Sequence, residues 1–275
     1  MTWEEAVLWM KSQSDQQDLV RACYYDEPRL AAACRFWESE EWQTVCEILV
    51  PWMPGRVLDL GAGNGISSFA FASSGCQVTA LEPDASSIVG VGAIGKLARE
   101  AKLPIERVQA VAEKTPFKNG TFDIVYGRQV FHHAADLEAL CMEAARVLRP
   151  GGVLMATREH VISRREDLTI FLNAHPLHRF YGGENAFLLR EYHQAIRRAG
   201  LRLKDVYGPY ESVINFFPMT CSECRTKLNA VLERYLGKWL ARRLSNRDRV
   251  RTLIGRYYSI IDRTPGRLYS FVAEK

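Results

Sequence analysis

Residues 56–65, RVLDLGAGNG, join a short apolar run to three closely spaced glycines. An apolar run that ends at glycines is typical of a buried parallel strand entering a tight turn. Residues 66–73 have the composition of a helix, and QVTALEPD (77–84) that of a second strand with Glu82 near its end. Glycines let a ligand lie against the backbone, a helix N-terminus offers free N–H groups, and a strand-end carboxylate accepts hydrogen bonds from ribose. The stretch therefore predicts a binding site for a nucleoside-like cofactor.

The glycine spacing disfavours two common classes of nucleotide. A dinucleotide site has a third glycine where this chain has Ile66, so the pattern is G-x-G-x-G and not G-x-G-x-x-G. The turn also lacks the lysine of a triphosphate-binding loop.

The alternation of strand and helix continues along the chain. Alternation of this kind is typical of an open parallel sheet with helices on both faces. We therefore expect an α/β fold with a Rossmann-like, seven-stranded, mostly parallel sheet whose last strand is antiparallel. The further expected strands are 106–112, 122–127, 152–159, 201–208 and 267–275, and the further helices are 88–102, 137–148 and 184–200.

Two regions depart from this rhythm. Residues 1–50 are rich in aromatic side chains, and residues 219–262 carry apolar residues at helical spacing in two blocks. We expect both regions to pack together as a cap over the carboxyl edge of the sheet. The chain then divides into an N-terminal helical cap (1–50), a Rossmann-like core (51–210), a helical insertion forming part of the cap (211–264) and a final core strand (265–275).

Composition limits the class of protein. The 275 residues are 47% hydrophobic and 25% charged, which is typical of a globular chain. No apolar run approaches the roughly 20 residues that cross a bilayer, and the N-terminus does not resemble a secretory signal. We expect a cytoplasmic protein whose seven scattered cysteines are reduced. Cys221 and Cys224 are half of a zinc motif, and we interpret them as structural thiols in preference to a metal or redox pair.

Charge is unevenly distributed. Residues 225–256 hold ten Lys/Arg against two Asp/Glu, whereas residues 1–50 hold ten Asp/Glu against four Lys/Arg. A basic helix can bind nucleic acid or an anionic membrane, or can simply be a solvated face, which is the interpretation we prefer.

At these motifs the chain resembles the class I S-adenosylmethionine-dependent methyltransferases, and within them the methyltransferase type 11 family. VLDLGAGNG and LEPD resemble the first and second family motifs, AEKTPFKNGTFDIVYGRQVFHH the adenine loop and fourth strand, and EAARVLRPGGVLMAT the following helix and strand. The resemblance covers about residues 55–160. It implies S-adenosyl-L-methionine as cofactor and S-adenosyl-L-homocysteine as product.

The resemblance also implies roles for individual residues. The methionine part of the cofactor would lie near the first glycines and the end of the fourth strand, the ribose at Glu82, and the adenine beside Pro83. Relatives carry Asp where this chain has Val111, so Glu113 or a backbone carbonyl would replace that adenine contact. The expected cofactor-binding residues are Asp59, Gly61, Gly63, Asn64, Glu82, Pro83, Ala112, Glu113, Gly127, Arg128 and Gln129.

The acceptor is expected over the fourth and fifth strands. His132, His133 and His160 are candidate catalytic bases because histidine can accept a proton near neutral pH, although the first two can also be a plain turn. Two arginines near this edge suggest an anionic acceptor, unless they pair with an acid. Tyr24 and Tyr25 either close over the ligands or fill the core of the cap. The expected substrate-binding residues are Tyr24, Tyr25, Arg158, Glu159, His178 and Tyr181.

The expected reaction is a displacement in which the acceptor attacks the activated methyl group in line, while the protein aligns the reactants and excludes water. We expect a small-molecule or saccharide-type acceptor in a bacterium, methylated at oxygen. No metal is expected, since no acidic residue ends the fourth strand. The alternatives are a methyltransferase that acts on nucleic acid through residues 225–256 and a non-catalytic protein that only binds the cofactor.

Overall fold

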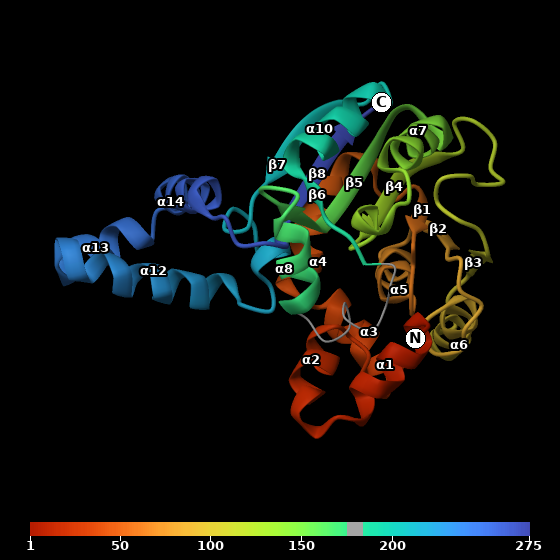
Figure 1. The fold of residues 1–275 in the computed structure, drawn as a ribbon, viewed down its shortest axis with the longest axis horizontal. Coiled ribbons are helices and arrows are strands. Elements are labelled where there is room, and N and C mark those ends of the chain that lie inside the picture. The colour runs from red at the N-terminus through yellow and green to blue at the C-terminus, as the bar shows by residue number, and fades with distance from the viewer. Residues whose placement is uncertain (175–183) are drawn as a thin grey trace.

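The computed structural model describes residues 1–174 and 184–275. Its centre is one mixed sheet with the strand order β3-β2-β1-β4-β5-β8-β7, and β6 pairs with β5 (Figure 1). The strands from β3 to β5 are parallel, and β8 runs antiparallel to both β5 and β7. The predicted fold class is confirmed, with β6 as an additional short strand. The strands are β1 (Arg56–Leu60), β2 (Gln77–Leu81), β3 (Ile105–Val108), β4 (Phe122–Arg128), β5 (Leu148–Ile162), β6 (Phe187–Leu188), β7 (Arg202–Tyr207) and β8 (Arg267–Glu274).

Helices cover both faces of this sheet because its strands are apolar on both sides. Val57 and Ile124 belong to the core on one face, with the first helix after β1, whereas Leu58 and Val125 belong to the core on the other face. A parallel sheet is buried on both faces, and these two cores cover one face each. The helix expected over 184–200 begins only at residue 189, since β6 precedes it. The core helices are α5 (Ile66–Ser73), α6 (Val91–Ala101), α7 (Leu137–Val147), α8 (Asp167–Ala174) and α10 (Leu189–Arg198), with the short turn η3 (Phe131–His133) after β4.

The N-terminal helices are joined to the core by stacked aromatic rings. Phe36 contacts Trp42 at 5.6 Å between ring centroids, Trp42 contacts Phe71 of α5 at 4.7 Å, and Phe71 contacts Tyr126 of β4 at 5.1 Å. Edge-to-face contacts of this kind add to the burial of apolar area. The elements are α1 (Trp3–Ser12), η1 (Ser14–Gln16), α2 (Gln17–Ala22), α3 (Arg29–Trp37), α4 (Glu40–Leu49) and η2 (Val50–Trp52).

The insertion between β7 and β8 forms an arm, which we define as residues 221–261. After the short α11 (Val213–Phe216), the helices α12 (Cys221–Leu236), α13 (Lys238–Ser245) and α14 (Asp248–Ile261) extend away from the body of the molecule (Figure 1). The described residues of α12 include no buried side chain, and Tyr235 and Trp239 are 81% and 72% exposed. The start of the insertion does contact the N-terminal helices, because Phe217 stacks on Tyr24 and the Cys221 N–H donates to Glu40, whereas the rest of the arm extends away from them. The division into a cap and a core stays a prediction. Apolar spacing predicts a helix with an apolar face, but it does not predict the surface that this face contacts.

None of the described helices combines the length and the hydropathy needed to cross a membrane.

Candidate functional site

Glu82 is fixed at the glycine turn by backbone hydrogen bonds. Its Oε2 accepts a bond of 2.9 Å from the Gly63 N–H, and its Oε1 accepts one of 3.0 Å from the Asp84 N–H. Burial raises the pKa of this carboxyl, and the two backbone donors oppose that rise. Each carboxylate oxygen has a second lone pair, so Glu82 can still accept hydrogen bonds from a ligand.

Gly61 and Gly63 of the turn differ in the space beside their Cα atoms. Both have a φ of +54°, which favours glycine. A Cβ on Gly61 would approach a methyl carbon of Val130 to 2.8 Å, so the segment after β4 packs against the turn there. A Cβ on Gly63 would meet only the Gly61 carbonyl oxygen, at 4.0 Å. The turn is therefore open beside Glu82, and its residues fit a ligand with a ribose.

Two polar residues of the first motif have partners within the protein. Asp59 is buried and accepts a hydrogen bond of 2.5 Å from the Ser68 hydroxyl, and burial raises the pKa of Asp59 to about 7. The Asn64 amide donates a bond of 2.7 Å to the Tyr24 carbonyl oxygen. Asn64 thus ties the N-terminal region to the glycine turn.

The predicted adenine residues lie in a loop that is fixed to α7. Glu113 accepts a hydrogen bond of 3.1 Å from the Ala135 N–H just before that helix. Pro83 accepts one of 3.1 Å from the Gln109 amide, and Ala112 is half-buried beside the core under α7. One carboxylate oxygen of Glu113 is therefore engaged with the protein, and its role towards adenine stays a prediction.

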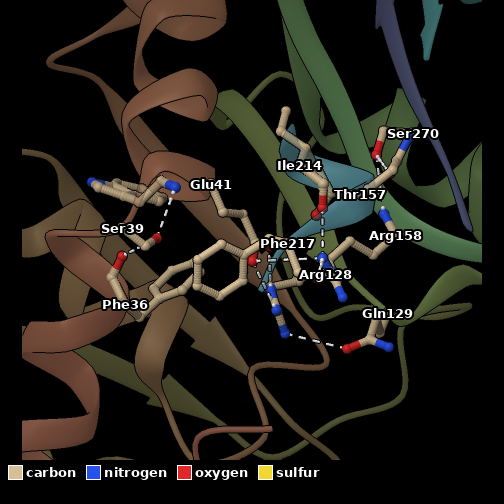
Figure 2. Close-up of polar contacts among 12 residues, drawn as sticks. Phe36, Ser39, Glu41, Arg128, Gln129, Thr157, Arg158, Ile214, Phe217 and Ser270 are labelled. Carbon is tan, nitrogen blue, oxygen red and sulfur yellow. Dashed lines mark hydrogen bonds and ion pairs between the residues drawn. The ribbon is translucent and has the colours of Figure 1, made fainter. Parts of the chain in front are cut away.

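Two predicted arginines share one buried acid, Glu41 (Figure 2). Arg128 makes two bonds to the Glu41 carboxylate, of 2.7 and 3.1 Å, and the Arg158 Nη1 lies 3.8 Å from it. The Arg158 Nη1 also donates to the Ile214 and Phe217 carbonyl oxygens, at 2.7 and 3.0 Å. The side chain of Glu41 is fully buried, and those of the two arginines are about one-tenth exposed. This Glu41 cluster, defined by Glu41, Arg128 and Arg158, joins α4 to the ends of β4 and β5.

Glu41 lies in the first turn of α4, and the start of this helix determines its position. Ser39 caps α4 by accepting a hydrogen bond of 3.1 Å from the Trp42 N–H, and an acid in the first turn of a helix is stabilised by the helix dipole. At the other side of the cluster, Arg128 Nη1 donates a bond of 3.2 Å to the side chain of Gln129, the first residue after β4. Glu41 was not predicted as a site residue, because the nearest of its partners is 87 residues away in the sequence.

The two tyrosines of the N-terminal region pack against aromatic rings of this region and, for Tyr24, of the insertion after β7. Tyr24 is 1% exposed, contacts Phe36 edge-on at 5.3 Å and stacks on Phe217 at 6.4 Å. Tyr25 is half-buried and contacts Trp3 of α1 at 6.4 Å. These contacts fit the interpretation in which the tyrosines fill the core of this region.

Three predicted histidines lie together at the ends of β4 and β5. The His132 Nδ1 lies 2.7 Å from Glu159, and the His132 Nε2 lies 3.1 Å from Glu184. The His132 ring is 4.2 Å from that of His133 and 4.6 Å from that of His160. Glu159 also accepts the backbone N–H groups of Val130 and His132, at 3.1 and 3.0 Å.

The environment of His132 changes its expected role. Burial lowers the pKa of this imidazole, but the hydrogen bonds to Glu159 and Glu184 outweigh burial and raise the pKa to about 9. In this environment His132 is protonated at neutral pH and cannot accept a proton. His160 has another kind of partner, since its Nδ1 donates a bond of 2.7 Å to the Gly266 carbonyl oxygen.

Two predicted substrate residues, His178 and Tyr181, lie outside the described residues. Cys221 and Cys224 are free thiols at the start of the arm, and burial raises the pKa of both.

Comparisons with known proteins agree with this geometry. Residues 58–156 match a family model described as a methyltransferase domain. A ubiquinone biosynthesis O-methyltransferase from Rhizobium etli is 28% identical over 159 residues, which are 56% of this chain and 63% of the relative. One from Xanthomonas campestris is 34% identical over 136 residues, 45% of this chain and 56% of the relative. Residues 58–156 are therefore similar to a methyltransferase domain. The match spans less than two thirds of the length of these curated relatives.

Solved structures share the fold of the methyltransferase domain and its flanking elements. The [4+2]-cyclase SpnF has a TM-score of 0.57 at 20% identity, with 90% of this chain and 82% of that chain covered. Geranyl diphosphate C-methyltransferase from Streptomyces coelicolor, solved with S-adenosyl-L-homocysteine, has a TM-score of 0.55 at 16% identity, with 90% and 84% covered. Likeness at this identity concerns the fold alone, and the cyclase illustrates that one fold serves different reactions.

Proposed function

We propose that the protein transfers a methyl group from S-adenosyl-L-methionine to an oxygen atom of a small molecule. The observation that carries the proposal is the Glu82 carboxylate, which Gly63 holds beside an open glycine turn within the methyltransferase domain. The printed names of the curated relatives, O-methyltransferases of ubiquinone biosynthesis, support oxygen and a small acceptor and give no support to nucleic acid.

Glu82 would bind the ribose hydroxyls of the cofactor, and Gly61 and Gly63 would lie along its methionine part. The loop at Ala112 would border the adenine, and Gly127 would lie near the sulfur at the end of β4. The cofactor supplies a methyl group that its sulfonium already activates. The chain therefore has to align the acceptor oxygen and exclude water.

The acceptor would lie over the ends of β4 and β5, between the Glu41 cluster and the histidines. Two arginines against one glutamate leave the Glu41 cluster with a surplus positive charge, which supports an acceptor with an anionic group. The Arg158 Nε is buried and has no hydrogen-bond partner among the described residues, so it is the group of this cluster best suited to such a ligand. His160, at the same edge, would accept the proton of the acceptor hydroxyl.

A transfer assay tests this proposal. The protein would be incubated with methyl-labelled S-adenosyl-L-methionine and a panel of phenols, catechols and saccharides, and labelled product would be measured. We expect label on a hydroxylated acceptor, loss of transfer with Glu82→Ala, and unchanged transfer with Glu47→Gln on the exposed side of α4. Cofactor binding without transfer to any acceptor would favour the non-catalytic alternative.

A further inference from the structure

The arm carries most of the large apolar side chains that the protein leaves exposed. Among the described residues, ten of the eighteen exposed large hydrophobic side chains lie between residues 231 and 261. Tyr235, Trp239 and Leu253 are each more than 60% exposed. The arm also extends away from the body, with α13 at its far end (Figure 1). A concentration of exposed apolar side chains on one projecting element indicates an interaction surface.

Basic side chains lie between these apolar ones. Residues 225–256 hold ten Lys/Arg against two Asp/Glu, and nine of the ten basic residues are exposed. On α13 the two kinds of side chain are direct neighbours, because the Arg243 guanidinium lies 5.4 Å from the centre of the Trp239 ring. The arm is therefore both cationic and apolar on its exposed surface.

The outward face of α13 is defined by the residues that it buries. Ala241 and Ser245 are buried one turn apart, and the Ser245 hydroxyl donates a bond of 3.2 Å to the Asn229 side chain of α12. With 3.6 residues per turn, Trp239 and Arg243 lie on the opposite side of the helix. Helix α13 thus packs one face on α12 and presents the Trp239–Arg243 face to the outside.

Helix α14 is arranged in the same way. The Ser259 hydroxyl accepts a hydrogen bond of 3.1 Å from the Tyr210 N–H, and Gly255 packs against the Tyr210 carbonyl group without room for a Cβ. These contacts fix one face of α14 on the segment after β7. The helical period places Leu253 and Tyr257 on the other face, and both are at least 60% exposed.

This mixture of side chains distinguishes between possible partners. The core of a protein–protein interface is depleted in charged residues, whereas basic side chains occur throughout the arm. A nucleic-acid interface is more polar and gives no role to exposed aliphatic side chains such as Leu253 and Ile260. The surface of a bilayer offers anionic headgroups to Lys and Arg, and a boundary with acyl chains in which Trp, Tyr and Leu are buried.

We propose that the arm, residues 221–261, binds the surface of a membrane that contains anionic lipid, with α13 and α14 lying in the headgroup region. These helices have 8 and 14 residues, so each is shorter than the roughly 20 residues of a spanning helix and fits one that lies in the plane of the interface. The sequence favoured a solvated face, because spacing does not show which apolar side chains stay exposed. The proposed methyl transfer uses no residue of the arm, so the two proposals are independent.

Co-sedimentation with vesicles tests the membrane surface. The full chain would be mixed with vesicles of phosphatidylcholine alone, or of equimolar phosphatidylcholine and phosphatidylglycerol, at low and at physiological salt. We expect binding to the mixed vesicles that weakens with salt, and little binding to phosphatidylcholine alone. Arg242→Gln with Arg243→Gln should weaken binding about tenfold or more, since each basic residue near an anionic surface contributes about fivefold. Trp239→Ala with Tyr257→Ala should also weaken it, although it leaves the charge unchanged.

The matched control is Arg190→Gln with Arg197→Gln, which removes the same charge from exposed positions of α10 on the body. It should bind vesicles as the unaltered protein does. Thermal unfolding and S-adenosyl-L-homocysteine binding would show that each variant is folded.

Three results would overturn the proposal. The first is no binding of the folded protein to the mixed vesicles, or equal binding to phosphatidylcholine alone. The second is an equal loss of binding in the arm variants and in the α10 control. The third is binding of an RNA or DNA duplex, or a dimer in light scattering that Trp239→Ala with Tyr257→Ala dissociates, without binding to vesicles.

Discussion

Glu41→Gln should destabilise the protein strongly, because Glu41 is the shared anion of two buried arginines. The substitution keeps the shape of the side chain but removes the charge that faces Arg128 at 2.7 and 3.1 Å and Arg158 at 3.8 Å. The amide nitrogen of the substituted side chain is a donor, as is the guanidinium that it would face, so no hydrogen bond could form between them. The carboxylate is fully buried, so water cannot replace it.

The expected loss follows from this burial. Removing one partner of a buried ion pair costs about 3–5 kcal/mol, since the remaining charge stays buried without compensation. With a urea slope of roughly 1–3 kcal/mol per molar, the unfolding midpoint should fall by about 1 M or more. The assay is equilibrium unfolding in urea followed by tryptophan fluorescence, with circular dichroism as a second probe.

Glu47→Gln is the matched control, because Glu47 lies on the same helix and is exposed. It should change the free energy of unfolding by no more than about 0.5 kcal/mol. The double variant Glu41→Gln with Arg128→Met should recover part of the loss, since it removes one of the two uncompensated charges. If Glu41→Gln and Glu47→Gln shift the midpoint equally little, the Glu41 cluster does not hold α4 on the core.

Three further substitutions test separate parts of the account. Glu82→Ala should weaken S-adenosyl-L-homocysteine binding tenfold or more, because hydrogen bonds to a charged group contribute about 1.5–3 kcal/mol each, and calorimetry would show an unchanged affinity if the ribose lies elsewhere. Gly63→Val should weaken binding further, since a branched side chain would fill the open turn and strain a φ of +54°; affinity equal to that of Glu82→Ala would contradict this. Hydrogen bonds from Arg146 hold the pKa of Glu143 at about 2, so the stabilisation is present above the ordinary value of about 4.3 and is lost as the pH falls towards 2. The difference in Tm between the unaltered protein and Glu143→Gln should therefore shrink over that range, and a constant difference would refute the assignment.

The central sheet and the glycine turn beside Glu82 could be predicted because their signals are local. The residues that carry these signals are close in sequence. The apolar run at Val57 indicates a buried strand, and the glycines after it indicate a tight turn near which Glu82 lies. The alternation of strands and helices then determines that β1, β2, β4 and β5 end at one edge. The antiparallel last strand was also predicted correctly.

Pairing between distant side chains could not be predicted in this way. Two arginines near the acceptor position were predicted, but their acid, Glu41, comes from α4. The histidines were predicted as bases, whereas Glu159 and Glu184 place His132 in a different protonation state. The apolar stripes of residues 219–262 predicted helices correctly, but they did not predict that α12 would contact α4 only at its first residue, Cys221, and then extend away. In each case local spacing leaves the contact surface undetermined.

Calorimetric titration of the protein with S-adenosyl-L-homocysteine, and in parallel with NAD, tests the central claim most directly. The account predicts one S-adenosyl-L-homocysteine site per chain, at least about tenfold tighter than any binding of NAD, which is a difference of about 1.4 kcal/mol. Tighter binding of NAD, or no heat with S-adenosyl-L-homocysteine from a folded protein, would contradict it.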